Sequence, residues 1–165
     1  MSKSYIKQFE GERIKESEKL IALCGPSGAG KGTLAKFIAE HLEIKFYSAG
    51  DFFRQIAEEK EMTVEELSNQ AKKETDMEVD KRTLKKGLNE DCVIESRIAA
   101  WVLGSYADLK IYLTADLEER AKRIKSDVKN RDNEEAASNL KQAKKIIKKR
   151  DRHNAERYKK YYEID

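Results

Sequence analysis

A short glycine-rich segment, which joins an apolar run to an amphipathic pattern, most constrains how this chain folds. The apolar run at residues 20–24 predicts a buried strand, and apolar residues spaced three and four apart over residues 34–42 predict one face of a helix. A strand, a glycine-rich turn with a lysine and a helix, in this order, predict a phosphate-binding loop. The loop consists of Gly25, Pro26, Ser27, Gly28, Ala29, Gly30, Lys31, Gly32 and Thr33.

The residue types of this loop suit a bound phosphate. Its glycines let the backbone turn tightly and approach a ligand without side-chain clashes. The N–H groups of the loop and of the first helical turn have no partners within the helix, and the helix dipole favours negative charge at that point. Lys31 adds a positive charge within reach of terminal phosphates. An ordinary tight turn with a solvated lysine would leave this combination of residues unexplained.

Composition and charge exclude several other classes of protein. Of the 165 residues, 39% are apolar and 39% are charged, which indicates one domain with a modest core and a heavily charged surface. A net charge of +3 is too balanced to favour nucleic acid as a partner. The chain has no apolar run as long as a membrane span, and its first 19 residues do not resemble a signal peptide, so we expect no membrane association. Cys24 and Cys92 fall in predicted strands, which indicates a reducing compartment, the cytoplasm.

Strands and helices are predicted to alternate along the rest of the chain. This alternation predicts an α/β fold of three layers, in which a short parallel sheet of four strands, or five, has helices on both faces. Ligands of such sheets bind at the carboxyl ends of the strands, so we expect the chemistry there. Further strands are predicted at residues 44–48, 92–94 and 109–113, and helices at about 49–57, 63–73, 76–88, 98–103, 116–124 and 134–162, with a loop at 126–133.

Polar and basic residues follow each predicted strand, and two arginines of the last helix lie two turns apart on a partly apolar stripe. Arginines on such a stripe need an anion to offset their desolvation, and the guanidinium group matches phosphate oxygens. Phosphoryl transfer consists mainly of positioning and charge stabilisation, for which a loop, a lysine, arginines and Mg²⁺ suffice. Surface ion pairs are the alternative for each arginine, and helix capping is the alternative for the glutamate. The residues are Ser48, Gly50, Arg54, Glu95, Arg97, Arg120, Arg123, Arg150 and Arg157.

Several of these segments together resemble the nucleoside monophosphate kinases of the P-loop type, and most closely the archaeal-type cytidylate kinases. The Gly-Lys-Gly-Thr ending of the loop is similar to the family's ATP loop, and residues 48–54 resemble its Ser-Ala-Gly-acid-x-x-Arg segment. Residues 95–97 resemble a Glu-Gly-Arg segment whose arginine meets the acceptor. Residues 119–123 and 150–158 resemble the segments before and after the family's lid, so that the resemblance covers about residues 19–165.

The resemblance implies a monomeric, cytoplasmic enzyme that transfers the γ-phosphoryl group of ATP to CMP, or to dCMP or UMP, with Mg²⁺. It implies that residues 25–33 and Arg120 bind ATP, and that Thr33 and, through water, Glu95 hold the metal. Residues 1–19 are charged with scattered apolar residues and are expected to form an N-terminal arm, and residues 20–165 are expected to form one kinase domain, for which the resemblance implies an NMP-binding region at about 49–90 and a lid at about 124–134. The acceptor would contact Ser48, Gly50, Arg54, Asp80, Arg97 and Arg157, and the catalytic residues would be Lys31, Arg97, Arg120, Arg123 and Arg150.

Two features depart from the family's pattern and leave alternatives open. Ser96 stands where the family usually has glycine, which would change how Arg97 is presented. Family members continue beyond the point that matches residue 165 with another strand and a helix, which predicts a four-stranded sheet here and an edge that residues 1–19 would cover. The alternatives are an adenylate-type or other small-molecule P-loop kinase, and a catalytically silent nucleotide-binding protein.

Overall fold

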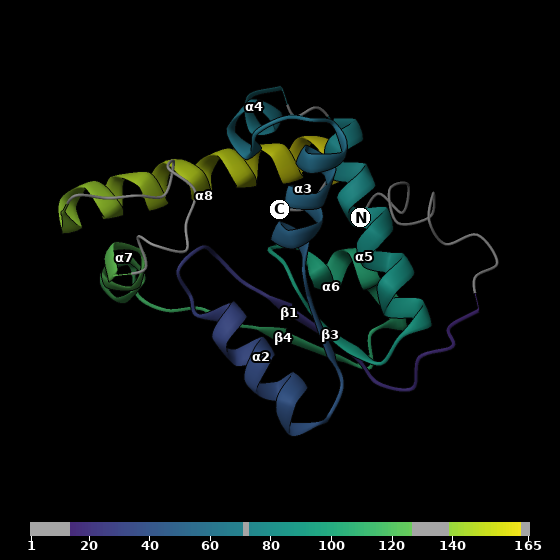
Figure 1. Cartoon of the computed structure of the whole chain (residues 1–165). Helices are drawn as coiled ribbons and strands as arrows, with labels where there is room; N and C mark the ends of the chain where they lie inside the picture. The colour runs from purple at the N-terminus through teal and green to yellow at the C-terminus, as the bar shows by residue number, and fades with distance from the viewer. Residues whose placement is uncertain (1–13, 71–72, 127–138, 163–165) are drawn as a thin grey trace.

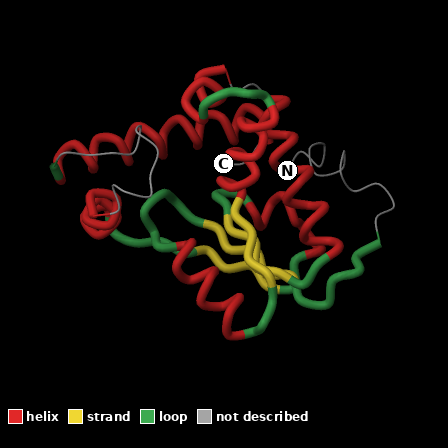
Figure 2. Tube along the Cα trace, viewed as in Figure 1, coloured by secondary structure: helices red, strands yellow, loops and turns green. Residues whose placement is uncertain are grey.

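A computed structural model describes residues 14–70, 73–126 and 139–162, in which four parallel strands form one sheet between layers of helices (Figures 1 and 2). The strands follow the order β2-β3-β1-β4, which confirms the predicted three-layer α/β fold. The elements are β1 (Leu20–Cys24), α2 (Lys31–His41), β2 (Lys45–Ser48), α3 (Ala49–Glu59), α4 (Val64–Gln70), α5 (Lys73–Asn89), β3 (Cys92–Glu95), α6 (Ala99–Leu103), η1 (Gly104–Tyr106), β4 (Leu109–Tyr112), α7 (Leu117–Ser126) and α8 (Leu140–Tyr162).

The two faces of the sheet contribute to two separate cores, because successive side chains of a strand point to opposite faces. Ile21, Leu23 and Val93 pack against α2 on one face. Leu20 and Ile94 pack on the other face with α5 and α6, which Figure 1 shows on the side of the sheet opposite α2. The strands β1 and β3 are therefore buried on both faces, as central strands of a parallel sheet are.

Helix α8 carries the C-terminal part of the fold across the top of the view in Figure 1, from α7 towards α5. Ala143 and Ile147 of α8 are buried against Ala121 and Ile124 of α7. Farther along the same helix, Tyr162 enters the core that includes α5 and α6. This path brings both ends of α8 close to the elements that follow the strands, where ligands of parallel sheets bind.

The helix boundaries agree with the sequence to within three residues, except at the start of the last helix. The predicted capping box forms before α4, since the Thr63 N–H donates to Glu66 Oε2 at 2.8 Å and the Glu66 N–H donates to Thr63 Oγ1 at 3.1 Å. The long last helix was expected from residue 134 but begins at Leu140, because the Asn139 side chain accepts the Gln142 N–H at 2.9 Å in the way of an N-cap. Residues 1–13 of the expected arm and 127–138 of the expected loop and lid lie outside the described residues.

The two cysteines lie in buried strands, as the sequence predicted. Cys24 and Cys92 are free thiols buried in the sheet, and burial raises the pKa of Cys92 to about 12. Within the described ranges, none of the helices combines the length and the apolar character needed to cross a membrane.

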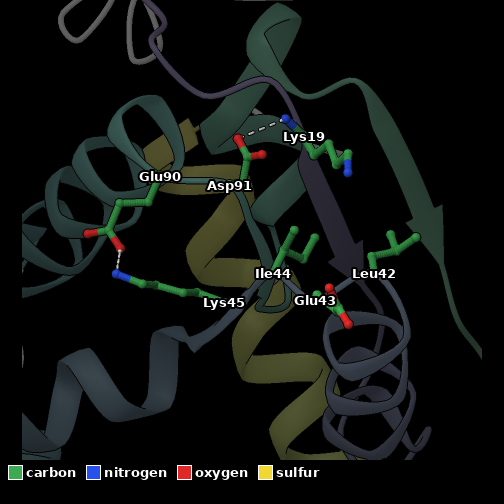
Figure 3. Close-up of a pocket in the computed structure, with 7 residues that line it drawn as sticks. All are labelled: Lys19, Leu42, Glu43, Ile44, Lys45, Glu90 and Asp91. Atoms are coloured by element: carbon green, nitrogen blue, oxygen red, sulfur yellow. Dashed lines mark hydrogen bonds and ion pairs between the residues drawn. The ribbon is translucent and has the colours of Figure 1, made fainter.

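A shallow hollow lies at the amino ends of the strands, at the edge of the sheet away from the phosphate loop (Figure 3). Lys19 precedes β1, Lys45 begins β2 and Asp91 precedes β3. Glu90 lines the hollow, and its carboxylate accepts hydrogen bonds from Lys45 Nζ at 2.6 Å, Tyr47 Oη at 2.6 Å and Lys86 Nζ at 2.7 Å. These three donors lower the pKa of Glu90 to about 2 from an ordinary value of 4.5.

The depressed pKa of Glu90 predicts a pH-dependent contribution to stability. A carboxyl group with a lower pKa in the folded state stabilises the fold above its unfolded pKa, near 4.5, and loses this contribution as the pH falls towards about 2. Glu90→Gln should therefore lower the melting temperature by about 2 °C at pH 7, since partly exposed ion pairs contribute little. The difference from the unchanged chain should narrow below about pH 4.5. Thermal unfolding between pH 3 and pH 8, with Glu43→Gln from the same hollow as control, tests this, and a difference that stays constant with pH would contradict it.

Candidate active site

The phosphate loop runs from β1 to α2 in backbone conformations that glycine adopts without strain. Gly28 and Gly30 have φ angles of 77° and 96°, and Gly30 is the N-cap of α2. Gly25 has a φ of 143° and lies against the residue after β4, where an added Cβ would be 1.9 Å from the Leu113 carbonyl oxygen. An added Cβ at Gly32, by contrast, would meet no atom within 4 Å. The loop thus leaves open space at the start of α2, where backbone N–H groups attract anions.

Lys31 lies at the centre of this loop and is largely shielded from solvent. Its ammonium group donates to the Pro26 carbonyl at 3.1 Å and is 3.9 Å from Glu95 Oε2 of β3. Burial lowers the pKa of Lys31, the charges of Arg97 and Arg120 act in the same direction, and the charge of Glu95 opposes them. The four charged groups therefore share one electrostatic environment at the carboxyl ends of β1 and β3.

Two arginines of α7 donate hydrogen bonds to backbone carbonyl groups of the loop. Arg120 Nε donates to the Ser27 carbonyl at 2.8 Å, and Arg123 Nη1 donates to the Ala29 carbonyl at 2.7 Å. Arg120 is only 8% exposed, and its guanidinium pairs with Asp151 of α8 at 2.7 Å. Both predicted arginines thus lie at the loop, and without a ligand their hydrogen bonds stabilise its backbone.

The last residue of β2, Ser48, faces Glu95 at the end of the neighbouring strand β3. Ser48 is paired in register with Glu95 and donates to Glu95 Oε1 at 2.7 Å, and its Oγ accepts the Gly50 N–H at 3.2 Å as the N-cap of α3. Arg54, one turn into α3, is half exposed and pairs with Asp51 at 2.5 Å. These contacts connect the start of α3 to the carboxylate beside the loop lysine.

A second group of charges lies between α5, α8 and the end of β3. Arg157 Nε is 3.4 Å from Asp76 Oδ2. Burial raises the pKa of Asp76, and the charges of Arg157 and Arg97 oppose this rise. The charge of Arg97 therefore acts on the pKa of both Lys31 and Asp76.

Two predicted residues on these helices lie in less open positions. Asp80 is 6% exposed and accepts a hydrogen bond from the Tyr162 hydroxyl at 2.8 Å, which joins α5 to the end of α8. Arg150 is half-buried on α8, one helical turn from the buried Ile147. The apolar residues that the sequence predicted on one side of this helix, Ile147 and Tyr161, do pack against core clusters.

The oxygen atoms near the loop fit a magnesium ion that is held mainly by substrate and water. Thr33 is exposed in the first turn of α2, and Glu95 is half-buried beside Lys31. In the part of the chain that the structure describes, three or more His, Cys, Asp or Glu side chains nowhere gather as metal ligands. Mg²⁺ commonly keeps several waters and uses one or two protein ligands with substrate phosphates, so one hydroxyl and one carboxylate are consistent with this ion.

The acidic residues that balance the charge of two of the arginines could not be identified from the sequence. Asp151 pairs with Arg120 across 31 residues, and Asp76 approaches Arg157 across 81 residues. Neither spacing is one that a single helix or strand brings together, so no periodic pattern could reveal it. The sequence could indicate only that each buried guanidinium group needs an acceptor, not which residue supplies it.

Comparisons with known proteins agree with this geometry at the level of the fold. A family model described as an AAA domain matches residues 21–157. The solved structure of a shikimate kinase from Bacteroides thetaiotaomicron has a TM-score of 0.64 and 19% identity, covering 83% of this chain and 80% of that one. The sheet order and the loop between β1 and α2 thus define a protein with the P-loop kinase fold.

Closer relatives are found by sequence. The chain is 43% identical over 152 residues to a cytidylate kinase of Haloarcula marismortui, which covers 88% of this chain and 73% of that protein. It is 44% identical over 107 residues to a cytidylate kinase of Ignicoccus hospitalis, which covers 64% of this chain and 62% of that protein. The chain belongs to the cytidylate kinase family. The predicted class of enzyme, a kinase, is confirmed by this membership.

Proposed function

We propose that this protein is a nucleoside monophosphate kinase that transfers the γ-phosphoryl group of ATP to CMP, with dCMP and UMP as further acceptors. The observation that carries the proposal is that the chain holds two separate cationic groups, each next to a carboxylate. One is Lys31 of the phosphate loop, 3.9 Å from Glu95, and the other is Arg157 of α8, 3.4 Å from Asp76. A reaction between two phosphorylated substrates requires positive charge at two places, because phosphoryl transfer depends on positioning and charge stabilisation. The names of the Haloarcula and Ignicoccus relatives support CMP as the acceptor.

In the proposed reaction, an oxygen of the CMP phosphate forms a bond to the γ-phosphorus of ATP while the bond to the β-phosphate oxygen breaks, which yields CDP and ADP. The N–H groups of residues 28–33 and Lys31 would bind the donor phosphates. Arg97, Arg120, Arg123 and Arg150 would neutralise charge on the transferred group, and the acceptor would lie near Ser48, Gly50, Arg54, Asp80 and Arg157. Thr33 and, through water, Glu95 would hold Mg²⁺, which supplies further charge neutralisation.

We also propose that the enzyme is a cytoplasmic monomer, with the NMP-binding region at about residues 49–90 and the lid at about 124–134. The buried free thiols of Cys24 and Cys92 support a reducing compartment. The helices α3, α4 and α5, which fall within 49–90, share an apolar cluster that includes Phe52 and Ile56. This cluster supports the proposal that they form one region, which is joined to the sheet through Leu84 and Leu88 of α5.

An acceptor panel tests the proposed reaction. ADP release from ATP and Mg²⁺ should be highest with CMP, lower with dCMP and UMP, and at background with AMP and with shikimate. Highest turnover with AMP would replace the proposal by an adenylate-type kinase. ADP release with none of the acceptors, together with calorimetric binding of ATP, would indicate a nucleotide-binding protein without turnover.

A further inference from the structure

The hydroxyl of Ser48 is engaged on both sides by the protein itself. It accepts the Gly50 N–H, so its single proton is left to donate, and it donates this proton to Glu95. Ser48 is 8% exposed, which limits access of a ligand to the hydroxyl. This geometry suits a residue that orients its neighbour more than one that contacts a substrate.

Glu95 has two carboxylate oxygens with different roles. Oε1 accepts the Ser48 hydroxyl at 2.7 Å, whereas Oε2 is directed to the Lys31 ammonium at 3.9 Å. A hydrogen bond to one oxygen fixes the rotation of the carboxylate about its terminal bond, which is otherwise a soft torsion. The Ser48 hydroxyl therefore determines which way Glu95 presents its second oxygen to the phosphate loop.

We propose that Ser48 is a positioning residue for the donor half of the site, and that its hydroxyl holds Glu95 in the orientation that serves Lys31 and the metal-bound phosphates of ATP. The proposal rests on the proposed function for the identity of the donor. It assigns to a residue at the start of the acceptor-side helix α3 an effect on the binding of ATP. The chain of contacts runs from the Gly50 N–H through Ser48 and Glu95 to Lys31.

Binding of Mg²⁺·ATP without acceptor, measured by calorimetry, tests this role apart from turnover. Ser48→Ala should weaken binding about tenfold, since a lost hydrogen bond to a charged group has an effect of this order. Ser48→Thr keeps the hydroxyl and should restore binding to within about twofold. Ser17→Ala is the matched control, because Ser17 is equally buried and its hydroxyl donates to the Gly87 carbonyl at 2.6 Å, away from the site.

A double substitution separates positioning from a general effect on α3. If Ser48 acts through Glu95, Ser48→Ala should change the affinity for Mg²⁺·ATP by less than about twofold in a Glu95→Ala background. A tenfold loss that persists in this background would indicate a weakened helix cap and overturn the proposal. Unchanged affinity in Ser48→Ala, with a higher KM for the acceptor alone, would assign Ser48 to the acceptor and also overturn it. Absence of turnover with every acceptor would refute the proposed reaction but leave this binding comparison valid.

Discussion

Lys31→Met should lower kcat by at least about 100-fold, because it removes an ammonium group that contacts both the loop and Glu95. The lysine is shielded, with 11% of its side chain exposed, so its charge acts in an environment where electrostatic interactions are strong. Methionine has a similar length and flexibility and fills much of the same space. The loss should therefore appear in the kinetics of phosphoryl transfer and not in the fold.

The measurement compares steady-state ADP release for Lys31→Met and for Lys36→Met, the matched control. Lys36 lies on the same helix α2 but is exposed, and its ammonium group lies over the Phe46 ring, 5.7 Å from the centroid. The control should keep its turnover to within about twofold, since isolated surface charges contribute little. Melting temperatures of both variants should stay within a few degrees of the unchanged chain. Undiminished turnover of Lys31→Met would refute the assignment of this loop to the phosphate donor.

Gly25→Ala should destabilise the fold by about 3 kcal/mol or more, which is the largest stability effect that we expect. The φ of 143° is unfavourable for any residue with a Cβ, and the added atom would be 1.9 Å from the Leu113 carbonyl oxygen. The obstacle is backbone, not a flexible side chain. Leu113 is fixed there because its N–H donates to the Cys24 carbonyl at 2.8 Å. Either β4 or the loop must move to admit the methyl group.

Gly32→Ala is the matched control for this effect, because an added Cβ at Gly32 would meet no atom within 4 Å. Residue 32 lies in the first turn of α2, where alanine is at least as favourable as glycine. Urea unfolding should therefore show a large loss for Gly25→Ala and no loss for Gly32→Ala. A Gly25→Ala chain that fails to accumulate in soluble form would agree with the prediction, and equal stabilities of the two variants would contradict it.

Much of the fold was predictable from local patterns. The strand at 20–24, the phosphate loop and α2 follow one another within about twenty residues, so local patterns specify them directly. The apolar face expected on α2 is correct for Leu34 and Ile38, whereas Phe37 and Leu42 are exposed. The predicted start of α8 was wrong, because helix-forming residues continue up to Asn139 and the sequence pattern does not reveal that this side chain caps the helix. Part of the site was also predictable, since residues after parallel strands meet at one edge of a sheet. Lys31 and Glu95 do lie together there, with 3.9 Å between the ammonium group and the carboxylate.

The sequence by itself determined that a strand leads through a glycine-rich loop into a helix, that this loop suits phosphate, and that the chain resembles the cytidylate kinases. These properties depend on neighbouring residues, whose spacing is readable. Only the tertiary structure decided that Asp151 compensates Arg120, that the Ser48 hydroxyl is directed to Glu95, and that Leu113 leaves no room for a Cβ at position 25. Each of these contacts joins residues more than 30 positions apart, and such pairs come together only when β1, β2, β3 and β4 assemble and α8 packs on α7.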